Sequence, residues 1–144
     1  MIVLDTTVLS EMMRPEPAHV VEAWLARQPA ASLYTTVIAQ AEILYALARL
    51  SFGRRRTALE REFRDMLEED FAGRVLAFDG AAAESYAVFM AERRRAGRPA
   101  GYQDAQIAAI ARSRGAALAT RNVSDFDGDG LDLINPWAAR RRDH

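Results

Sequence analysis

Cysteine and lysine are absent from this chain of 144 residues, and histidine occurs only twice. Without cysteine the chain has no disulfide, no thiolate zinc site and no cysteine nucleophile. The histidines are His19, near an expected helix start, and His144, at the end of the sequence, and neither is placed to act as a general base. The chemistry open to the chain is therefore that of carboxylates, hydroxyls and any metal ion that carboxylates bind.

Long hydrophobic runs are missing as well. No apolar run approaches the roughly 20 residues that cross a bilayer, and the start, MIVLDTT, has neither the basic segment nor the cleavage site of a signal peptide. Hydrophobic residues make up 50% of the chain and charged residues 27%, which is typical of a folded globular domain. We therefore expect one cytoplasmic domain, residues 1–144, with no membrane contact.

The positive charge is carried entirely by arginine, and the net charge is −1. A near-neutral protein has no general attraction for a polyanion, so any contact with nucleic acid must come from a local arrangement of charges. Runs of three arginines at residues 54–56, 93–95 and 140–142 have a chemistry that suits phosphate backbones. Coding bias in a chain rich in alanine and arginine explains these runs better.

Short apolar segments alternate with helical patterns along the chain. Strands are expected at residues 1–4, 32–35, 75–78, 116–120 and 131–134. Helices are expected after Asp5 with Thr6 or Thr7 as the cap, around residues 20–25, from Thr36, over residues 54–69, from residue 79 or 80, and from residue 103 to Gly115. Strands that alternate with helices predict an α/β fold with a parallel sheet covered by helices on both faces.

The helix expected from Thr36 shows an apolar stripe, made of Ile38, Ala41, Leu44, Tyr45 and Ala48. Glu42 lies within this helix, which is unusual because glutamate is seldom buried unless it is paired. The segment 54–69 alternates charges around four apolar residues, Leu59, Phe63, Met66 and Leu67. That pattern predicts an amphipathic helix with a solvent-facing charged side.

Sites in parallel sheets form at the carboxyl ends of the strands, and this rule selects Asp5 and the loop after Thr120. Glu42 and Asp104 would complete an acidic site if their helices face the same crevice. Two carboxylates about 4 Å apart repel by roughly 4 kcal/mol at an effective dielectric near 20, so a cluster needs protons or a cation. Oxygen ligands favour Mg²⁺ or Mn²⁺, whose bound water suits phosphodiester hydrolysis.

Each acidic residue also has a structural explanation. Asp5 alone serves equally well as a helix cap, and Asp104 in a first turn is stabilised by the helix dipole. The aspartates after Asn122 are common turn residues, namely Asp125, Asp127, Asp129 and Asp132. Their spacing up to Gly130 matches half of a calcium-binding EF-hand loop, but Pro136 stands where that loop needs a glutamate, which argues against calcium.

Four ordered motifs, LDTTVLSE, AEILYAL, DAQIAAIA and ATRNVSDF, are followed by INPW. Together they resemble the PIN-domain toxins of the VapC type, with FitB-like members the most similar. The resemblance implies a PIN-like three-layer fold, with four to five short parallel strands between helices. It also implies an endoribonuclease that depends on Mg²⁺ or Mn²⁺ and is the toxin of a type II toxin–antitoxin module. Such a toxin is expected to form a homodimer and to bind a VapB/FitA-like antitoxin.

Matched residue by residue, the acidic cluster of such proteins falls on Asp5, Glu42, Asp104 and Asp125. The resemblance implies that the side chains supporting the site are Thr6, Thr120 and Asn122. The spacing Thr-x-Asn-x-x-Asp-Phe selects Asp125 over Asp127. Two departures are Thr7, where such toxins commonly have asparagine, and Ala46, where they frequently have glycine.

Two other functions stay open from the residues alone. The first is a phosphotransfer or phosphatase domain with Asp5 as the covalent acceptor. The absence of lysine argues against it, as does Thr7 where such phosphatases need a second aspartate. The second is a PIN-like module that binds RNA or protein without cutting, and retention of all four acidic matches argues against this. The RNA target cannot be identified from the sequence, because it depends on the shape of the groove and the fold of the RNA.

Overall fold

The computed structural model describes residues 1–127 and 130–138, and it contains one parallel sheet with the strand order β3-β2-β1-β4-β5. The strands are β1 (Ile2–Leu4), β2 (Leu33–Thr36), β3 (Val75–Leu76), β4 (Ala117–Ala119) and β5 (Leu133–Ile134). The predicted α/β fold with a parallel sheet of four to five short strands is confirmed. Predictions for Asp129 and for residues 139–144 lie outside the described residues.

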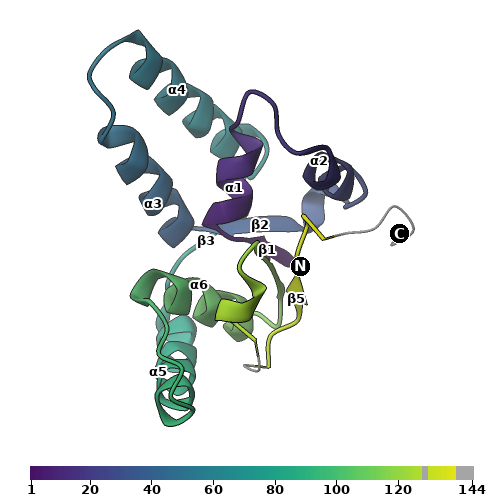
Figure 1. Ribbon diagram of the computed structural model, residues 1–144, viewed down its shortest axis with the longest axis vertical. Coiled ribbons are helices and arrows are strands. Elements are labelled where there is room, and N and C mark those ends of the chain that lie inside the picture. Colours follow the sequence, from purple (N-terminus) through teal and green to yellow (C-terminus); the bar gives the residue numbers. More distant parts are fainter. Residues whose placement is uncertain (128–129, 139–144) are drawn as a thin grey trace.

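Six helices flank this sheet in the described part of the chain, together with two short 3-10 helices at Ala30–Ser32 and Val123–Asp125. They are α1 (Thr6–Met12), α2 (His19–Ala26), α3 (Val37–Ala48), α4 (Arg54–Glu69), α5 (Gly80–Arg95) and α6 (Tyr102–Ser113). In Figure 1, α1, α3 and α4 lie above the sheet, and α5 and α6 lie below it. The helices and the sheet thus form three layers. Among the described residues, no helix combines the length and the apolar character needed to cross a membrane.

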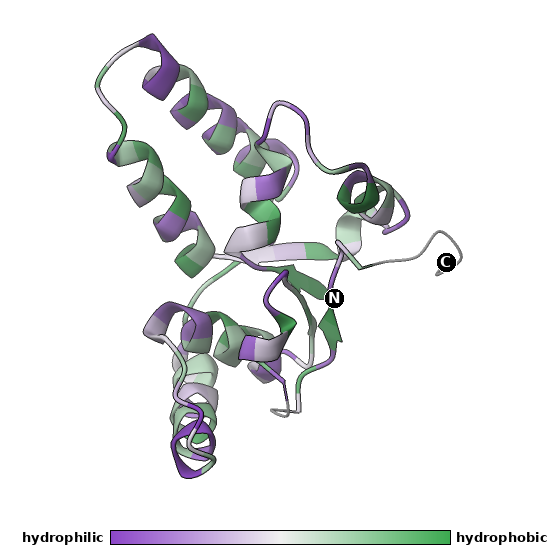
Figure 2. Ribbon diagram, viewed as in Figure 1, coloured by the Kyte–Doolittle hydropathy of each residue, from purple (hydrophilic) through white to green (hydrophobic). Residues whose placement is uncertain are grey.

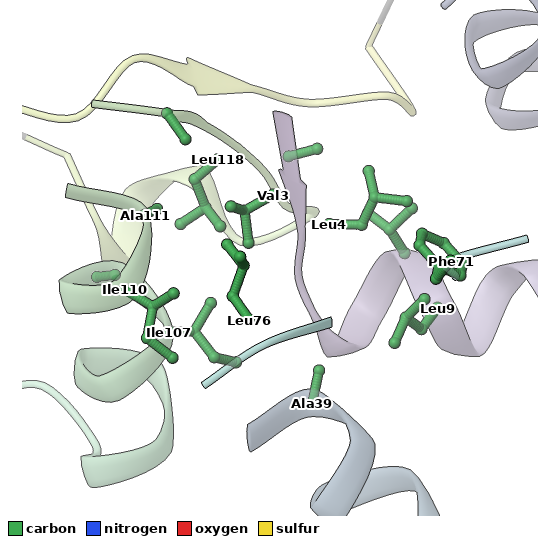
Figure 3. Close-up of a cluster of buried hydrophobic side chains, with 14 of the residues drawn as sticks. Val3, Leu4, Leu9, Ala39, Phe71, Leu76, Ile107, Ile110, Ala111 and Leu118 are labelled. Atoms are coloured by element: carbon green, nitrogen blue, oxygen red, sulfur yellow. The ribbon is translucent and has the colours of Figure 1, made fainter. Parts of the chain in front are cut away.

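The core is built around β1, the middle strand of the sheet. Val3 and Leu4 are completely buried because a parallel strand between two others is covered by helices on both faces. Figure 3 shows the β1 side chains between Ile107 of α6 on one side and Leu9 of α1 on the other. The short apolar run that predicted a central strand is therefore central in the sheet.

Local caps explain where the helices begin. Asp5, Thr6 and Thr7 were all expected as possible caps of α1, and it is Asp5 that caps the helix by accepting a hydrogen bond from Val8 N at 3.2 Å. A carboxylate one residue before the helix replaces the weaker hydroxyl in this role. Thr36 caps α3 as predicted, with Ala39 N donating to its hydroxyl at 3.1 Å. Gly115 follows α6 with a φ of +62°, a left-handed conformation that glycine adopts readily and that ends the helix.

The apolar stripe predicted for α3 is wrong in its registry. The buried residues of α3 are Ala39, Ile43 and Leu47, whereas Tyr45 is 67% exposed. Apolar residues occur on every side of this helix, so its periodicity does not select one face. By contrast, α4 alternates hydrophilic and hydrophobic residues along its length (Figure 2), and Phe63 is buried as the amphipathic pattern predicts.

Candidate active site

Asp5 lies directly after β1, and its backbone N–H donates to Ala119 O of the neighbouring strand at 3.0 Å. Its side chain is 3% exposed. Burial raises the pKa of Asp5, while a hydrogen bond from the Thr120 hydroxyl acts most strongly against this rise, followed by a bond from Thr7 Oγ1 at 2.5 Å. Asp5 is therefore both a helix cap and a carboxylate held at the carboxyl end of the sheet.

Glu42 is half-buried on α3, where α3 packs beside α1. Its Oε1 accepts a hydrogen bond from Thr6 Oγ1 at 2.9 Å, although the two residues are 36 positions apart. Thr6 directly follows Asp5, so this bond ties the second predicted carboxylate to the first one. Glu42 is thus paired, as its place in an apolar helix required.

Asp104 is half-buried in the first turn of α6. The pKa of Asp104 is raised first by burial and then by the negative charges of three other carboxylates, those of Asp125, Glu42 and Asp5. Charges that shift one another's pKa lie within a short electrostatic range of each other. The carboxylates of Asp125, Glu42 and Asp5 come from separate stretches of the chain but lie near enough to Asp104 for their charges to act on it.

A cleft of about 520 Å³ opens at this region. It is lined by Asp5, Thr6, Thr7, Ser10, Glu11, Arg14, Glu42, Asp104, Arg121, Asn122 and Trp137. Three of the four predicted carboxylates thus line the cleft, whereas Asp125 is exposed at the end of the adjoining 3-10 helix. Thr120 is completely buried beneath the cleft, and its hydroxyl accepts from Asn122 N at 3.0 Å.

The donor set suits a hard cation, because every candidate ligand is a carboxylate oxygen. Within residues 1–127 and 130–138, no group of three acidic or histidine side chains is arranged so that it could hold a metal ion by itself. Mg²⁺ does not require such a cage, since it commonly uses one or two carboxylates together with water and substrate phosphate. Asp5, Glu42 and Asp104 line one cleft with oxygen donors only, and such donors fit a divalent cation that keeps water among its ligands.

The segment after Asn122 does not have the architecture of an EF-hand. It begins with the 3-10 helix Val123–Asp125 and leads into β5, which pairs in parallel with β4. An EF-hand loop would need a helix on each side. The structure of this segment therefore argues against a calcium-binding loop, as does Pro136 at the position where that loop needs a glutamate.

Six residues that line the cleft were not predicted as site residues, namely Thr7, Ser10, Glu11, Arg14, Arg121 and Trp137. Thr7 Oγ1 donates to Asp5 and accepts from Arg121 N at 3.1 Å, across 114 positions of sequence. From the sequence, Thr7 was a possible helix cap and a departure from the usual asparagine, but not a partner of Asp5. The bond between Thr7 and Arg121 joins residues 114 positions apart, so residue spacing and periodicity could not predict it.

Comparison with known protein families decides the identity of this fold, since the PIN domain matches residues 2–127. The chain belongs to the PIN-domain family. This PIN domain is 43% identical to the VapC ribonuclease Y4jK of Sinorhizobium fredii, over 95% of the chain and 98% of that protein. It is 34% identical to the toxin FitB of Neisseria gonorrhoeae, over 95% of the chain and 99% of that protein.

Solved structures agree with the sequence relatives. The crystal structure of FitAcB from Neisseria gonorrhoeae superimposes on this PIN domain with a TM-score of 0.90 at 33% identity. The match covers 96% of the chain and 100% of the matched one. The resemblance to VapC- and FitB-type PIN domains is therefore confirmed over nearly the whole chain.

Proposed function

We propose that this PIN domain is a metal-dependent endoribonuclease and the toxin of a type II toxin–antitoxin pair. The observation that carries the proposal is that Asp5, Glu42 and Asp104, from separate elements, line one cleft, with Asp125 in the adjoining 3-10 helix. The names of the similar proteins, a VapC ribonuclease and a FitB toxin, support the same activity.

In this proposal the four carboxylates hold one or two Mg²⁺ or Mn²⁺ ions. When bound, such an ion supplies an activated water and neutralises charge on the phosphate and the leaving oxygen. Thr6, the residue after Asp5, holds the Glu42 carboxylate through its hydrogen bond of 2.9 Å. Thr120 holds Asp5 through its hydroxyl, and Asn122 lines the cleft above it. These supporting contacts keep the acidic oxygens in place before a cation or substrate arrives.

Asp125 is a better fourth acid than Asp127. The charge of Asp125 is among the causes that raise the pKa of Asp104, which supports this choice, and the charge of Asp127 is not. The spacing Thr-x-Asn-x-x-Asp-Phe also selects Asp125. The buried Phe126 between the two residues anchors the segment, and we assign Asp125 to the site.

A phosphatase that uses Asp5 as its nucleophile is a poorer fit. Such phosphatases need a second aspartate where Thr7 stands, and Thr7 instead donates its hydroxyl to Asp5 Oδ1 at 2.5 Å. No lysine exists anywhere in the sequence to bind the transferred group.

We also propose a domain organisation, a cellular location and binding partners for this PIN domain. We assign residues 1–144 to one domain that acts on RNA in the cytoplasm, and we expect a homodimer inhibited by a VapB/FitA-like antitoxin. The relative named FitB is called a toxin, and the similar solved structure is of FitAcB. Co-expression with a small protein encoded beside this gene should yield a stable complex, and the absence of such a reading frame would count against the toxin assignment.

The deciding experiment replaces Asp5 with asparagine, which also caps helices well and so leaves α1 intact. Purified protein is incubated with RNA in Mg²⁺ or EDTA, and RNA ends are sequenced after induced expression. The matched control is Asp79→Asn, which changes the cap of α5, where Ala82 N donates to Asp79 at 2.9 Å outside the cleft. We expect cleavage by the parent and by Asp79→Asn only. A folded Asp5→Asn protein that still cuts RNA in Mg²⁺ would show that the proposed role of Asp5 is wrong.

A further inference from the structure

Arg121 and Trp137 form a stacked pair in the same cleft as the carboxylates. The guanidinium carbon of Arg121 lies 5.0 Å from the centre of the Trp137 ring, and both residues line the cleft together with Asp5 and Asp104. Trp137 is partly buried and packs against the hydrophobic core. A cation held over a fixed indole ring keeps its orientation at little further entropic cost.

The backbone of Arg121 is fixed relative to Asp5. Its N–H donates to Thr7 Oγ1 at 3.1 Å, and the same hydroxyl donates to the Asp5 carboxylate. Arg121 also directly follows Thr120, whose hydroxyl bonds to Asp5. The root of the arginine side chain is therefore attached to the acidic site through two hydroxyls.

The charge of Arg121 is available, unlike that of the other arginine in the cleft. Arg14 pairs with Glu11 at 3.3 Å, and Ala18 N also donates to that carboxylate at 3.0 Å. Arg121 acts on Glu11 only at longer range, as one of the smaller causes that lower its pKa. Within the described residues, no carboxylate lies within 4.0 Å of the Arg121 guanidinium as an ion-pair partner.

A cleft lined by carboxylates repels a polyanion, and the net charge of −1 offers no general attraction. A strand of RNA that enters this cleft needs a cation at its wall. The arginine fork matches phosphate oxygens, and phosphate contacts fix the register of a nucleic acid on a protein. From these observations we infer that Arg121 binds a backbone phosphate of single-stranded RNA beside the acidic cluster, and that Trp137 is a positioning residue for its guanidinium.

This inference rests on the proposed function for its ligand class but is tested separately from cleavage. Binding of a short fluorescent single-stranded RNA is measured by anisotropy in EDTA at several KCl concentrations. For Arg121→Gln we expect affinity to fall roughly tenfold, as for loss of one charged hydrogen-bonded contact. The slope of log binding constant against log KCl should shrink by about 0.7, because one phosphate fewer releases its counterion.

The matched control is Arg49→Gln. Arg49 also lies over an aromatic ring, with its guanidinium carbon 5.8 Å from the centre of the Tyr45 ring, but it does not line the cleft. Arg49→Gln removes the same charge and the same kind of stacking as Arg121→Gln, but it does so outside the cleft. We therefore expect its RNA affinity and salt slope to equal those of the parent. A parent protein that fails to bind RNA, or an Arg121→Gln protein that matches Arg49→Gln, overturns the inference.

Two variants of Trp137 test whether its ring positions the Arg121 guanidinium, with RNA affinity and salt slope as the measurements. Trp137→Leu keeps the charge of Arg121 but removes the ring, so we expect weaker binding with the parental salt slope. Trp137→Phe retains a ring and should restore most of the affinity. Equal affinity of both variants and the parent overturns the positioning role.

The two proposals fail in distinguishable ways. Cleavage of RNA by the parent, together with an unchanged salt slope in Arg121→Gln, refutes the phosphate contact and leaves the nuclease assignment standing. A reduced slope in Arg121→Gln, together with no cleavage in Mg²⁺, refutes the nuclease assignment and leaves the RNA contact standing.

Discussion

Replacing Thr7 with valine removes two hydrogen bonds at the junction between α1 and the end of β4. The bond to the Asp5 carboxylate belongs to the charged class, worth about 1.5–3 kcal/mol, and the bond from Arg121 N to the neutral class, worth about 0.5–1.5 kcal/mol. Arg121 is exposed and Thr7 half-buried, so water replaces part of what is lost. We therefore expect the free energy of unfolding to fall by about 2 kcal/mol.

For a chain near 150 residues, this loss lowers the melting temperature by about 4–8 °C. A second effect follows, because the Thr7 hydroxyl lowers the pKa of Asp5 and its removal raises that pKa further. The acid limb of the pH–rate profile for RNA cleavage should then move to higher pH, since the proposed site needs Asp5 ionised.

The assays are urea unfolding in EDTA and initial cleavage rates across pH in Mg²⁺. Thr7→Ser keeps the hydroxyl and is the control, with both measurements expected near those of the parent. The reasoning is refuted if Thr7→Val has the unfolding midpoint and the pH profile of Thr7→Ser.

Three further predictions concern the acids and their anchor. Asp104→Asn should abolish cleavage yet raise the urea midpoint in EDTA, because it removes a charge that three other carboxylates repel; a lower midpoint would contradict this. In the folded chain the pKa values of Asp5 and Asp104 lie above their ordinary value of 3.8, so the folded state retains more protons than the unfolded state. These two groups should therefore lower the free energy of unfolding in EDTA as pH rises above 3.8, and Mg²⁺ should reduce that fall. Because the lowered pKa of Glu11 acts in the opposite direction, the parent is compared with Asp104→Asn in urea titrations; the same pH dependence in both proteins would be inconsistent with the shift of Asp104. Phe126→Ala should cost about 3–5 kcal/mol, because its ring is buried beside Asp125; calorimetry that finds a loss below about 1 kcal/mol would show that this anchor matters little.

Much of the secondary structure could be predicted because local patterns determine it. The apolar run before Asp5 predicted the middle strand, and alternation of strand and helix predicted a parallel α/β sheet. The cap at Thr36 and the stop at Gly115 follow from side-chain and backbone chemistry that acts within a few residues. Such features need no knowledge of what lies elsewhere in the molecule.

Helix faces and caps were less predictable where two local solutions compete. The predicted stripe of α3 included Tyr45, which is exposed, because α3 is apolar all round and only its neighbours decide which side is buried. Asp5, Thr6 and Thr7 were all possible caps of α1. Asp5 is the cap, and the Thr6 and Thr7 hydroxyls bond instead to Glu42 and Asp5. The packing of α1 thus assigned functions that the sequence left open.

The sequence by itself determined the fold class, the strand that ends at Asp5 and, through ordered motifs, which four carboxylates to consider. Only the tertiary structure decided that Asp5, Glu42 and Asp104 line one cleft with Asp125 in the adjoining 3-10 helix. With β1 placed between β2 and β4, the end of β1 lies beside both Thr36, where α3 begins, and Thr120. That strand order also brings Arg121 to Thr7 across 114 residues. Such contacts depend on the packing of distant segments, and local periodicity and propensity carry no information about that packing.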